Sequence, residues 1–397
     1  MKPNLAIAII NELREKGYEA YLVGGCVRDM VMGLEPADYD IATSARPEEV
    51  VKMFPRTERI GAQFGVILVI YRGHPFEVAT FRSDEAYVDG RRPTGVVYTD
   101  ARQDVLRRDF TINGLLYDPV TKDVIDYVGG QADIKAKLVR AIGDARARFD
   151  EDKLRILRAI RFGARFGYQI EPVTWAAACA MAGKIHQVSS ERVREELTRI
   201  LTEGQAARGF RLLDESGLRT EILPDLDWTE HVQRSLKLLR PGTEPDFAMG
   251  VLLQQTAVSK VERIVQRLKF SRAEMHHIVA LVENLPRFSG IHQMPVANLK
   301  RFFRLNRFED HIELARIYRL AAGEDLADVN YVRRKRTEWT DQDIFPQPLV
   351  TGDDLISMGF APGPVFKDIL NRLEEEQLEG RLANPGQALE FIKQNYR

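Results

Sequence analysis

Residues 22–43 read LVGGCVRDMVMGLEPADYDIAT, and this stretch decides the fold expected for the N-terminal part of the chain. The apolar run that ends at Val23 predicts a strand, and Gly24 and Gly25 predict a tight turn after it. Glycine has no Cβ, so the backbone of such a turn can approach a phosphate closely and present free N–H groups to it. Arg28 adds a cation shortly after the glycines. The start of the stretch therefore predicts a phosphate-binding site.

The same stretch closes with two aspartates, Asp38 and Asp40. Residues two apart on a strand point to the same face, and two carboxylates on one face repel each other unless a cation lies between them. Hard oxygen ligands of this kind suit Mg²⁺. A Gly-Gly pair alone is usually a plain turn, and an Asp-x-Asp pair alone is usually a solvated strand edge. Their combination at a short spacing after an apolar strand favours a joint phosphate and metal site.

A third carboxylate is a candidate for the same site. Residues 65–71 are a nearly continuous β-branched run, which predicts a buried strand, and residues 76–81 predict a second strand. Glu77 and Ala79 share one face of this second strand. A carboxylate on an interior strand is costly unless it is paired or binds a metal, although a glutamate at a solvated strand edge is an equally good interpretation. Asp109 is the alternative candidate for the third carboxylate.

Length and composition limit the classes of protein that the chain can represent. Its 397 residues exceed one ordinary domain, so two to four modules are expected. The net charge of −1 argues against a globally basic nucleic-acid-binding surface but permits local basic stripes. No apolar run approaches the roughly 20 residues of a membrane span, and residues 1–17 predict an amphipathic helix rather than a signal peptide. Cys26 and Cys179 provide neither a disulfide framework nor a zinc cluster, which favours a reducing, cytoplasmic setting.

Two segments follow the predicted strands. Residues 82–99 are polar and rich in turn-forming residues, and they predict a long loop of the kind that is usually functional or disordered. Residues 104–117 have helical character, with the paired arginines Arg107 and Arg108 near their start. The simplest interpretation of this second segment is an amphipathic helix.

Residues 150–165 predict a helix whose first turn is acidic. At about 100° per residue, four arginines fall on one arc and the apolar residues on the opposite arc, with Leu154 and Phe162 as exceptions. Arg155 has acidic residues within helical reach, and the other three arginines have none. Such a face differs from an ordinary solvated surface and predicts an anionic partner, either a triphosphate or a nucleic-acid backbone. The four residues are Arg155, Arg158, Arg161 and Arg165.

Helical patterns continue to the C-terminus, where two features suggest RNA contact. Residues 331–339 hold a basic cluster with aromatic neighbours; such a cluster is usually a solvated face, but interleaved aromatics favour RNA binding. Gly363 precedes Pro364 at an expected helix start and could present backbone N–H groups to a phosphate, although a plain turn is as good an interpretation. The candidate RNA-binding residues are Arg333, Arg334, Lys335, Arg336 and Gly363.

Five motifs in a fixed order resemble those of the class II tRNA nucleotidyltransferases. This family comprises the bacterial CCA-adding enzymes and their poly(A) polymerase relatives, and it belongs to the DNA polymerase β-like nucleotidyltransferase superfamily. The resemblance extends more loosely from the last motif to the C-terminus. The motifs lie at residues 23–29 with 38–43, 107–113, 126–130, 151–155 and 191–197.

The resemblance implies an α+β fold. A nucleotidyltransferase head of the polymerase β type, with a mixed sheet and helices, is expected to precede an extended all-α neck, body and tail. The expected bounds are 1–137 for the catalytic head, 138–205 for the neck that selects the nucleotide, 206–325 for the body and 326–397 for the tRNA-binding tail.

The resemblance also implies roles for individual residues. Asp38 and Asp40 would hold two Mg²⁺ ions, with Glu77 as a third catalytic carboxylate. Asp152 and Arg155, at i and i+3 on one helix face, would pair with the Watson–Crick edge of CTP or ATP; a plain intrahelical ion pair is the alternative. The fifth motif would brace this template helix. The residues expected to bind the nucleotide are Gly24, Gly25, Arg28, Arg108, Asp109, Asn113, Asp152, Arg155, Arg158 and Arg161.

The implied activity is addition of C, C and A to the 3′ end of tRNA from CTP and ATP, with release of pyrophosphate. Enzymes that add only A or only CC, and poly(A) polymerases, are alternatives, and the loop at 82–99 disfavours a CC-only enzyme. A dinucleotide-binding oxidoreductase is disfavoured because the turn lacks Gly-x-Gly-x-x-Gly. A non-catalytic RNA-binding module is disfavoured by the intact Asp38 and Asp40. The expected partners are tRNA and the two nucleotides, with no membrane and no protein partner.

Overall fold

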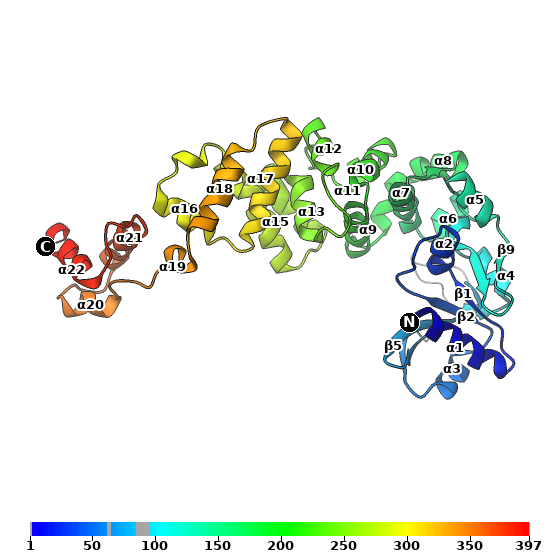
Figure 1. Ribbon diagram of the computed structural model, residues 1–397. Coiled ribbons are helices and arrows are strands. Elements are labelled where there is room, and N and C mark those ends of the chain that lie inside the picture. Colours follow the sequence, from blue (N-terminus) through cyan, green and yellow to red (C-terminus); the bar gives the residue numbers. More distant parts are fainter. Residues whose placement is uncertain (1, 62–64, 85–95, 397) are drawn as a thin grey trace. The chain divides into compact units, whose positions relative to one another are not determined.

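The computed structural model describes residues 2–61, 65–84 and 96–396 (Figure 1). The chain divides into two compact units, and the finer division into head, neck, body and tail stays a prediction. The first unit comprises Met1–Leu226, Leu239–Pro245 and Ile264–Phe270, and the second comprises Asp227–Leu238, Asp246–Arg263 and Ser271–Arg397.

The expected mixed sheet is confirmed in the first unit, where it has seven strands. Its strands are β1 (Ala20–Val23), β2 (Asp40–Thr43), β3 (Thr57–Gly61), β4 (Val66–Tyr71), β5 (His74–Thr80), β8 (Leu115–Asp118) and β9 (Asp123–Asp126). They lie in the order β3-β4-β5-β2-β1-β8-β9, in which β2 and β5 are parallel and the other neighbours antiparallel.

Two short ladders complete the strands of the first unit. Strands β6 (Arg82–Asp84) and β7 (Val96–Tyr98) pair antiparallel, and β10 (Leu138–Val139) and β11 (Gln169–Ile170) pair parallel. The predicted loop at residues 82–99 thus begins and ends in a short ladder. Its central part, residues 85–95, lies outside the described residues.

Helices bury the faces of the large sheet. Helix α1 (Lys2–Glu15) packs its apolar stripe on β1 and β2, and α3 (Pro47–Met53) packs on β4 and β5. Helix α4 (Ala101–Leu106) places Ala101 and Val105 in an apolar cluster with residues of β1, β2 and β8. The predicted N-terminal helix and the three predicted strands are confirmed. The strand predicted to be buried at residues 65–71 is β4, and it is half-buried, because inward and outward residues alternate along it.

The helix predicted at residues 104–117 is wrong. Helix α4 ends at Leu106, a short 3₁₀ turn spans Thr111–Asn113, and the chain then enters β8. Leu116 and Tyr117 pair with β1 on one side and with β9 on the other. Pairing on both edges of a strand outweighs a local helical pattern, because propensity is a weak prior against tertiary contacts.

The single helix predicted at residues 150–165 is also wrong, because it is broken at Asp152. Helix α6 (Ala145–Glu151) ends there, and α7 (Leu154–Phe166) begins two residues later. Asp152 has an extended backbone, with φ −144° and ψ 105°, and its carboxylate accepts a hydrogen bond from the Leu154 N–H at 3.1 Å. A short acidic side chain favours such a cap over a position within a helix.

The first unit continues as helices. Helix α7 packs against α9 and α10, which places the arginine-bearing helix among other helices. The helices are α2 (Gly25–Val31), α5 (Gly130–Ala136), α8 (Pro172–Ala180), α9 (Ser190–Thr202), α10 (Ala206–Glu215) and α11 (Leu218–Ile222).

The second unit is helical throughout its described length, and α14 passes from it into the first unit. No helix among the described residues is long and apolar enough to cross a membrane. The helices are α12 (Glu230–Leu236), α13 (Pro245–Leu253), α14 (Val258–Arg267), α15 (Arg272–Asn284), α16 (Val296–Phe303), α17 (Phe308–Ala322), α18 (Ala327–Glu338), α19 (Asp341–Ile344), α20 (Gly352–Ser357), α21 (Pro364–Leu378) and α22 (Pro385–Asn395).

A buried charged cluster joins α13, α15 and α17 in the second unit. His277 Nδ1 lies 2.9 Å from Asp246 Oδ2, and His277 Nε2 lies 3.3 Å from Asp310 Oδ2. Burial by itself lowers the pKa of His277, but its contacts with the two aspartates outweigh that effect and hold the pKa above its ordinary value. Arg307, which pairs with both aspartates, and His311, whose pKa burial lowers to about 4, complete the surrounding charges.

We predict that His277 stabilises the second unit in a pH-dependent way. Because the pKa is raised on folding, the stabilisation is fully present below the unfolded-state pKa of about 6.5 and is lost as the pH rises through the folded-state pKa. His277→Gln should therefore lower the free energy of unfolding by about 1.5–3 kcal/mol at pH 6, the range of hydrogen bonds to charged groups, and by less at pH 9. Denaturant titrations at both pH values measure this difference.

The exposed neighbour His276 provides the control. His276→Gln should leave the free energy of unfolding nearly unchanged at both pH values. A cost of His277→Gln that is the same at pH 6 and pH 9 would contradict the assignment of a charged His277.

Candidate active site

A cavity of about 520 Å³ opens in the first unit beside the glycine turn. The walls come from the turn after β1, the segment after α4, and the helices α7 and α9. Nine of the lining residues are arginines and three are aspartates, so the cavity is strongly cationic. It is lined by Gly24, Gly25, Arg28, Asp40, Arg107, Arg108, Asp109, Asn113, Asp152, Leu154, Arg155, Arg158, Arg161, Phe162, Arg165, Arg192 and Arg199.

The glycine turn needs glycine at its first position. Gly24 has φ +73°, and a Cβ placed on it would lie 3.0 Å from a guanidinium nitrogen of Arg108. Both the left-handed backbone and the close approach of Arg108 therefore disfavour any side chain. The turn leads directly into α2, so backbone N–H groups and the Arg108 cation share one corner of the cavity.

Arg28 is buried behind this turn and is held in one orientation. Its guanidinium donates to Asp29 Oδ1 at 2.8 Å and to Asn113 Oδ1 at 2.7 Å. Its Cζ lies 4.7 Å from the ring centre of Phe166 and 5.4 Å from that of Phe162. These contacts hold the Arg28 guanidinium of α2 against α7. The cavity as a whole keeps a net positive charge, because arginines outnumber aspartates in its lining.

Three predicted carboxylates, Asp38, Asp40 and Glu77, repel one another electrostatically and are called the carboxylate patch, and Asp40 among them lines the cavity. The parallel register that pairs Ile41 of β2 with Val78 of β5 makes Asp40 and Glu77 neighbours across the two strands. Burial, followed by the negative charges of Glu77 and Asp38, raises the pKa of Asp40 to about 6, while Arg108 acts in the opposite direction. Asp38 is exposed, and its Oδ1 lies 3.7 Å from Lys2 Nζ.

This patch has the chemistry of a divalent-cation site, because a cation between the carboxylates would offset both the burial of Asp40 and its repulsion by Glu77 and Asp38, the two causes of its raised pKa. Within the described part of the chain, no three His, Cys, Asp or Glu side chains form a complete set of metal ligands. Such an incomplete set fits Mg²⁺, which typically takes one or two protein carboxylates and completes its shell with water and substrate phosphates.

Asp109, the alternative third carboxylate, has a different environment. It is buried and accepts hydrogen bonds from Asn113 Nδ2 at 3.1 Å and from Arg158 Nε at 2.8 Å. Burial alone would raise its pKa, but the Arg158 charge and these hydrogen bonds lower the pKa to about 2. Asp109 therefore holds Arg158 in place. Of the two candidates for the third carboxylate, Glu77 is the one that neighbours Asp40.

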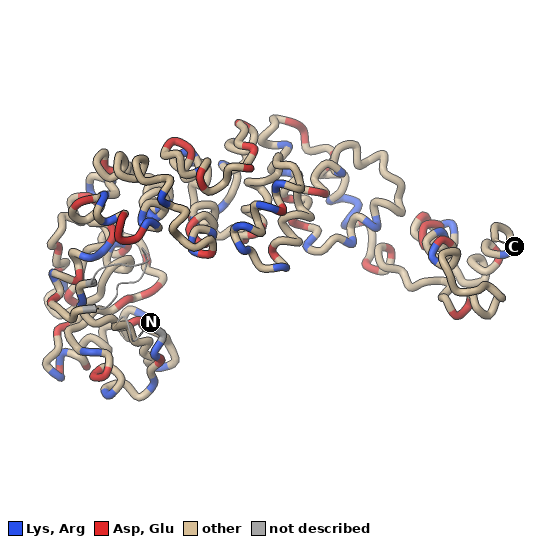
Figure 2. Tube along the Cα trace, turned by 180° about the vertical axis from the view of Figure 1, so that it is seen from behind, with Lys and Arg blue, Asp and Glu red and all other residues tan. Residues whose placement is uncertain are grey.

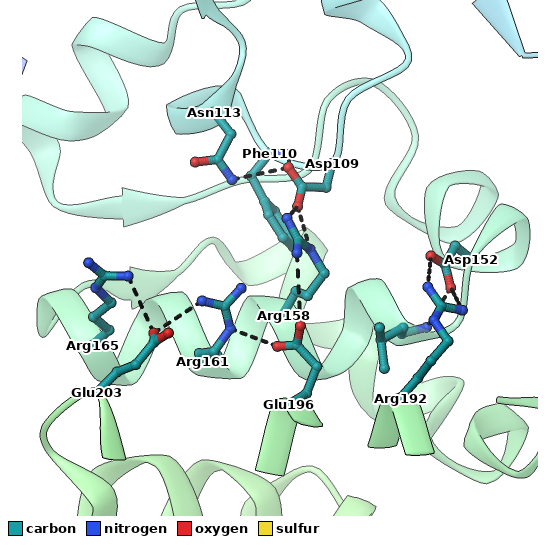
Figure 3. A network of polar contacts seen from close by, with 11 residues as sticks. Asp109, Phe110, Asn113, Asp152, Arg158, Arg161, Arg165, Arg192, Glu196 and Glu203 are labelled. Carbon is teal, nitrogen blue, oxygen red and sulfur yellow. Dashed lines mark hydrogen bonds and ion pairs between the residues drawn. The ribbon is translucent and has the colours of Figure 1, made fainter. Parts of the chain in front are cut away.

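The three arginines of α7 that have no acidic residue within helical reach find acidic partners on other elements of the fold (Figure 3). Glu196 of α9 accepts from Arg161 Nε at 2.6 Å, and its second oxygen lies 3.8 Å from Arg158 Nη1. Glu203, which follows α9, accepts from Arg161 at 3.1 Å and from Arg165 at 3.4 Å. Sequence spacing detects partners within one helix and misses those on a neighbouring helix.

Asp152 and Arg155 both line the cavity, although they do not share a continuous helix. Arg192 of α9 donates to both oxygens of Asp152, at 3.2 and 2.8 Å (Figure 3). Arg155 donates to Glu151 at 2.7 Å and to the main-chain oxygens of Arg148 and Arg107, each at 3.2 Å. Each side chain is thus fixed by a different neighbour.

The candidate RNA-binding residues lie in the second unit. The basic residues of α18 have acidic neighbours: Arg333 lies 3.5 Å from Glu313, and Lys335 lies 2.6 Å from Glu338. Arg334 and Arg336 likewise lie within 3.6 Å of Glu338 and 3.3 Å of Asp341. Figure 2 shows Lys and Arg interspersed with Asp and Glu along the chain. Gly363 is exposed and directly precedes α21. Their role in binding RNA stays a prediction.

Several cavity residues were not among those predicted to bind the nucleotide. Arg165 belongs to the predicted arginine arc, and the off-arc positions of Leu154 and Phe162 were the signal that could have identified them. Arg192 lies in the fifth motif. Nothing in the sequence distinguishes Arg199 from a solvated arginine, because its place in the cavity depends on how α9 packs against α7.

Comparison with known families supports these features. Three family models match the chain: the poly A polymerase head domain at residues 20–140, the probable RNA and SrmB-binding site of polymerase A at 167–229, and the putative tRNA nucleotidyltransferase domain 2 at 246–392. The CCA-adding enzyme of Levilactobacillus brevis is 33% identical over 97% of this chain and 96% of its own. The CCA-adding enzyme of Streptococcus mutans is 32% identical over 98% of this chain and 96% of its own.

Solved structures show the same fold. The Bacillus stearothermophilus CCA-adding enzyme in complex with CTP has a TM-score of 0.73 and 28% sequence identity, covering 100% of this chain and 98% of that one. The Thermotoga maritima CCA-adding enzyme complexed with tRNA_CCA has a TM-score of 0.68 and 20% identity, covering 99% and 95% of the two chains.

We predict that Glu196 contributes to stability through its buried contact with Arg161. Glu196→Gln should lower the free energy of unfolding by about 1.5–3 kcal/mol, because Arg161 would lose a charged hydrogen-bond partner while remaining buried. Glu195→Gln is the matched control, since Glu195 is exposed on the same helix. Denaturant unfolding measures both variants, and equal stability of the two would contradict the prediction.

Proposed function

The chain belongs to the family of CCA-adding enzymes, and on this basis we propose that it adds C, C and A to the 3′ end of tRNA. The substrates are CTP and ATP, and pyrophosphate is released. The cavity itself supports the proposal most strongly, because Asp40 and a glycine turn line it opposite a row of arginines. A nucleoside triphosphate fits this arrangement. Its phosphates require the cations, and its α-phosphate must lie where the RNA hydroxyl attacks, beside the carboxylates.

Asp38, Asp40 and Glu77 are proposed to hold two Mg²⁺ ions. When bound, such ions lower the pKa of the attacking RNA hydroxyl and neutralise the leaving pyrophosphate. Burial and then repulsion from Glu77 and Asp38 raise the pKa of Asp40, and this supports the assignment, since a buried group among like charges has most to gain from a cation.

The protein's own cations are proposed to bind and orient the triphosphate. The turn at Gly24 and Gly25 offers backbone N–H groups, and Arg28, Arg108, Arg158 and Arg161 surround the same space. Charge-assisted hydrogen bonds from preoriented guanidinium groups stabilise charge that develops on phosphate oxygens. Asp109 and Asn113 contribute by holding Arg158 and Arg28 in place.

Asp152 and Arg155 are proposed to select the base. A carboxylate accepts a hydrogen bond from the exocyclic amine that C carries at N4 and A at N6, where U and G carry a carbonyl oxygen, and a guanidinium donates to a ring nitrogen or carbonyl. Arg192 holds Asp152, and the main chain of Arg107 and Arg148 holds Arg155, so both groups are preoriented. The broken helix supports this role, because the break turns Asp152 into the cavity that Arg155 also lines.

The remaining assignments follow the family. We propose a catalytic head at 1–137, a neck at 138–205, a body at 206–325 and a tRNA-binding tail at 326–397, with Arg333–Arg336 and Gly363 among the tRNA contacts. Free Cys26 and Cys179 are compatible with action in the cytoplasm.

The function is tested by incubating the full chain with tRNA that lacks its 3′ terminal CCA. CTP alone should extend the RNA by two nucleotides, and CTP with ATP should extend it by three, read at single-nucleotide resolution. Asp40→Ala should abolish extension while RNA binding persists. Addition of A alone, addition of CC alone, or a long poly(A) product would each replace the proposal with the corresponding specialised enzyme.

We predict that Asp152→Ala relaxes base choice. The ratio of kcat/KM for CTP over UTP should fall by about 10- to 100-fold, because one base-specific hydrogen bond is lost. Asp150→Ala is the control, since Asp150 is largely exposed at the end of the same helix and pairs with Lys153 and Lys184. An unchanged ratio in Asp152→Ala would remove the template role from this residue.

A further inference from the structure

Helix α9, together with Glu203 directly after it, presents one stripe of charged side chains to α7. The stripe consists of positions 192, 196, 199 and 203, which are three or four residues apart and therefore share a face. Arg192 pairs with Asp152, Glu196 with Arg158 and Arg161, and Glu203 with Arg161 and Arg165. The member without such a pair is Arg199.

Arg199 differs from every other arginine of the cavity. Each of the other eight has an acidic partner within 4 Å, as in the pairs Arg28–Asp29, Arg107–Asp104, Arg108–Asp104 and Arg155–Glu151. Within the part of the chain that the structure describes, the Arg199 side chain has no acidic partner and no hydrogen bond, and it is exposed while lining the cavity. Among the described residues, no acidic side chain balances the positive charge of Arg199, and this charge borders the space that a ligand would occupy.

The position of Arg199 along α9 indicates which part of a nucleotide it would meet. Asp152 and Arg192 mark one end of the α7–α9 contact, and Arg165 and Glu203 mark the other. Arg199 lies one turn from Glu196 and one turn from Glu203, hence near Arg161 and Arg165. With a rise of 1.5 Å per residue, Arg165 lies roughly 15 Å along α7 from Arg155.

The end near Arg165 is also the end where α2 meets α7. Arg28 of α2 stacks on Phe166 at 4.7 Å, and the glycine turn leads directly into α2. If the base lies at Asp152 and Arg155, the phosphates extend toward this end. The last phosphate then lies farthest from the base, beside an arginine whose charge is not already neutralised.

We propose that Arg199 binds the terminal phosphates of the incoming CTP or ATP, the part that leaves as pyrophosphate. This inference rests on the proposed function of the cavity. The carboxylates Glu196 and Glu203 fix the other arginines of the row, and Arg199 supplies the positive charge that remains for the ligand. Its contact is with the β- or γ-phosphate, so it is equal for both nucleotides and has no part in base choice.

The test compares binding of CTP and CMP, which differ only in the two terminal phosphates. Isothermal titration calorimetry is carried out on the full chain with Mg²⁺ and without RNA, so that no turnover is needed. Arg199→Ala should weaken CTP binding by about tenfold, the effect of one charge-assisted hydrogen bond, and leave CMP binding unchanged. Arg199→Lys should give an intermediate affinity, because an ammonium keeps the charge but loses the planar geometry.

Arg211→Ala is the matched control, because Arg211 lies on α10 outside the cavity lining and pairs with Glu215 at 3.7 Å. It removes the same charge and should leave CTP affinity unchanged. CTP affinity of Arg199→Ala equal to that of the unmodified chain would overturn the inference, as would equal losses for CTP and CMP.

Two further outcomes separate this inference from the proposed function. If Arg199→Ala weakens RNA binding and not CTP binding, Arg199 contacts an RNA phosphate and the inference is wrong while the function stands. If the unmodified chain binds neither CTP nor ATP, the proposed function itself fails, and the inference fails with it.

Discussion

Charge compensation between α7 and α9 is the interaction on which the candidate active site depends. Arginines one turn apart on α7 point into one cavity, where their mutual repulsion would spread them apart in the absence of counterions. Glu196 and Glu203 approach from α9, and Asp109 approaches from the segment after α4. Each acid is shared or buried, so the arginines are fixed in position while an excess of positive charge remains. A preorganised set of cations of this kind costs little reorganisation when an anionic substrate binds.

The same contacts join the part of the cavity beside Asp40 to the part where we propose that the base is recognised. Asp109 holds Arg158, the main-chain oxygen of Arg107 holds Arg155, and Phe166 supports Arg28. In each of these contacts, one residue lies on α7 and the other lies on α2 or in the segment after α4, next to the large sheet. The carboxylate patch at Asp40 and the proposed template pair at Asp152 and Arg155 therefore keep a fixed spacing, which would place an α-phosphate at the carboxylates with a base bound at the pair.

The sequence predicted the residues of the site better than it predicted their local structure. The glycine turn, the acidic pair and the arginine arc are spaced along the chain in ways that their chemistry requires, and the structure brings most of them to one cavity. The break at Asp152 was missed because an acidic residue near a helix start is compatible with either a continuing helix or a new cap. The strand β8 was missed because its two pairing partners are distant in sequence. Arg199 was missed because packing between two helices has no local signal.

The central claim is that one cavity binds the whole nucleotide, with the base at Asp152 and Arg155 and the phosphates toward Gly25 and Arg28. A crystal structure of this chain with CTP and Mg²⁺ tests it most directly. We expect a cytosine edge within hydrogen-bond distance of Asp152 and Arg155, and a triphosphate between the glycine turn and the arginines of α7. A cytosine bound beside the glycine turn, or CTP bound outside this cavity, would contradict it.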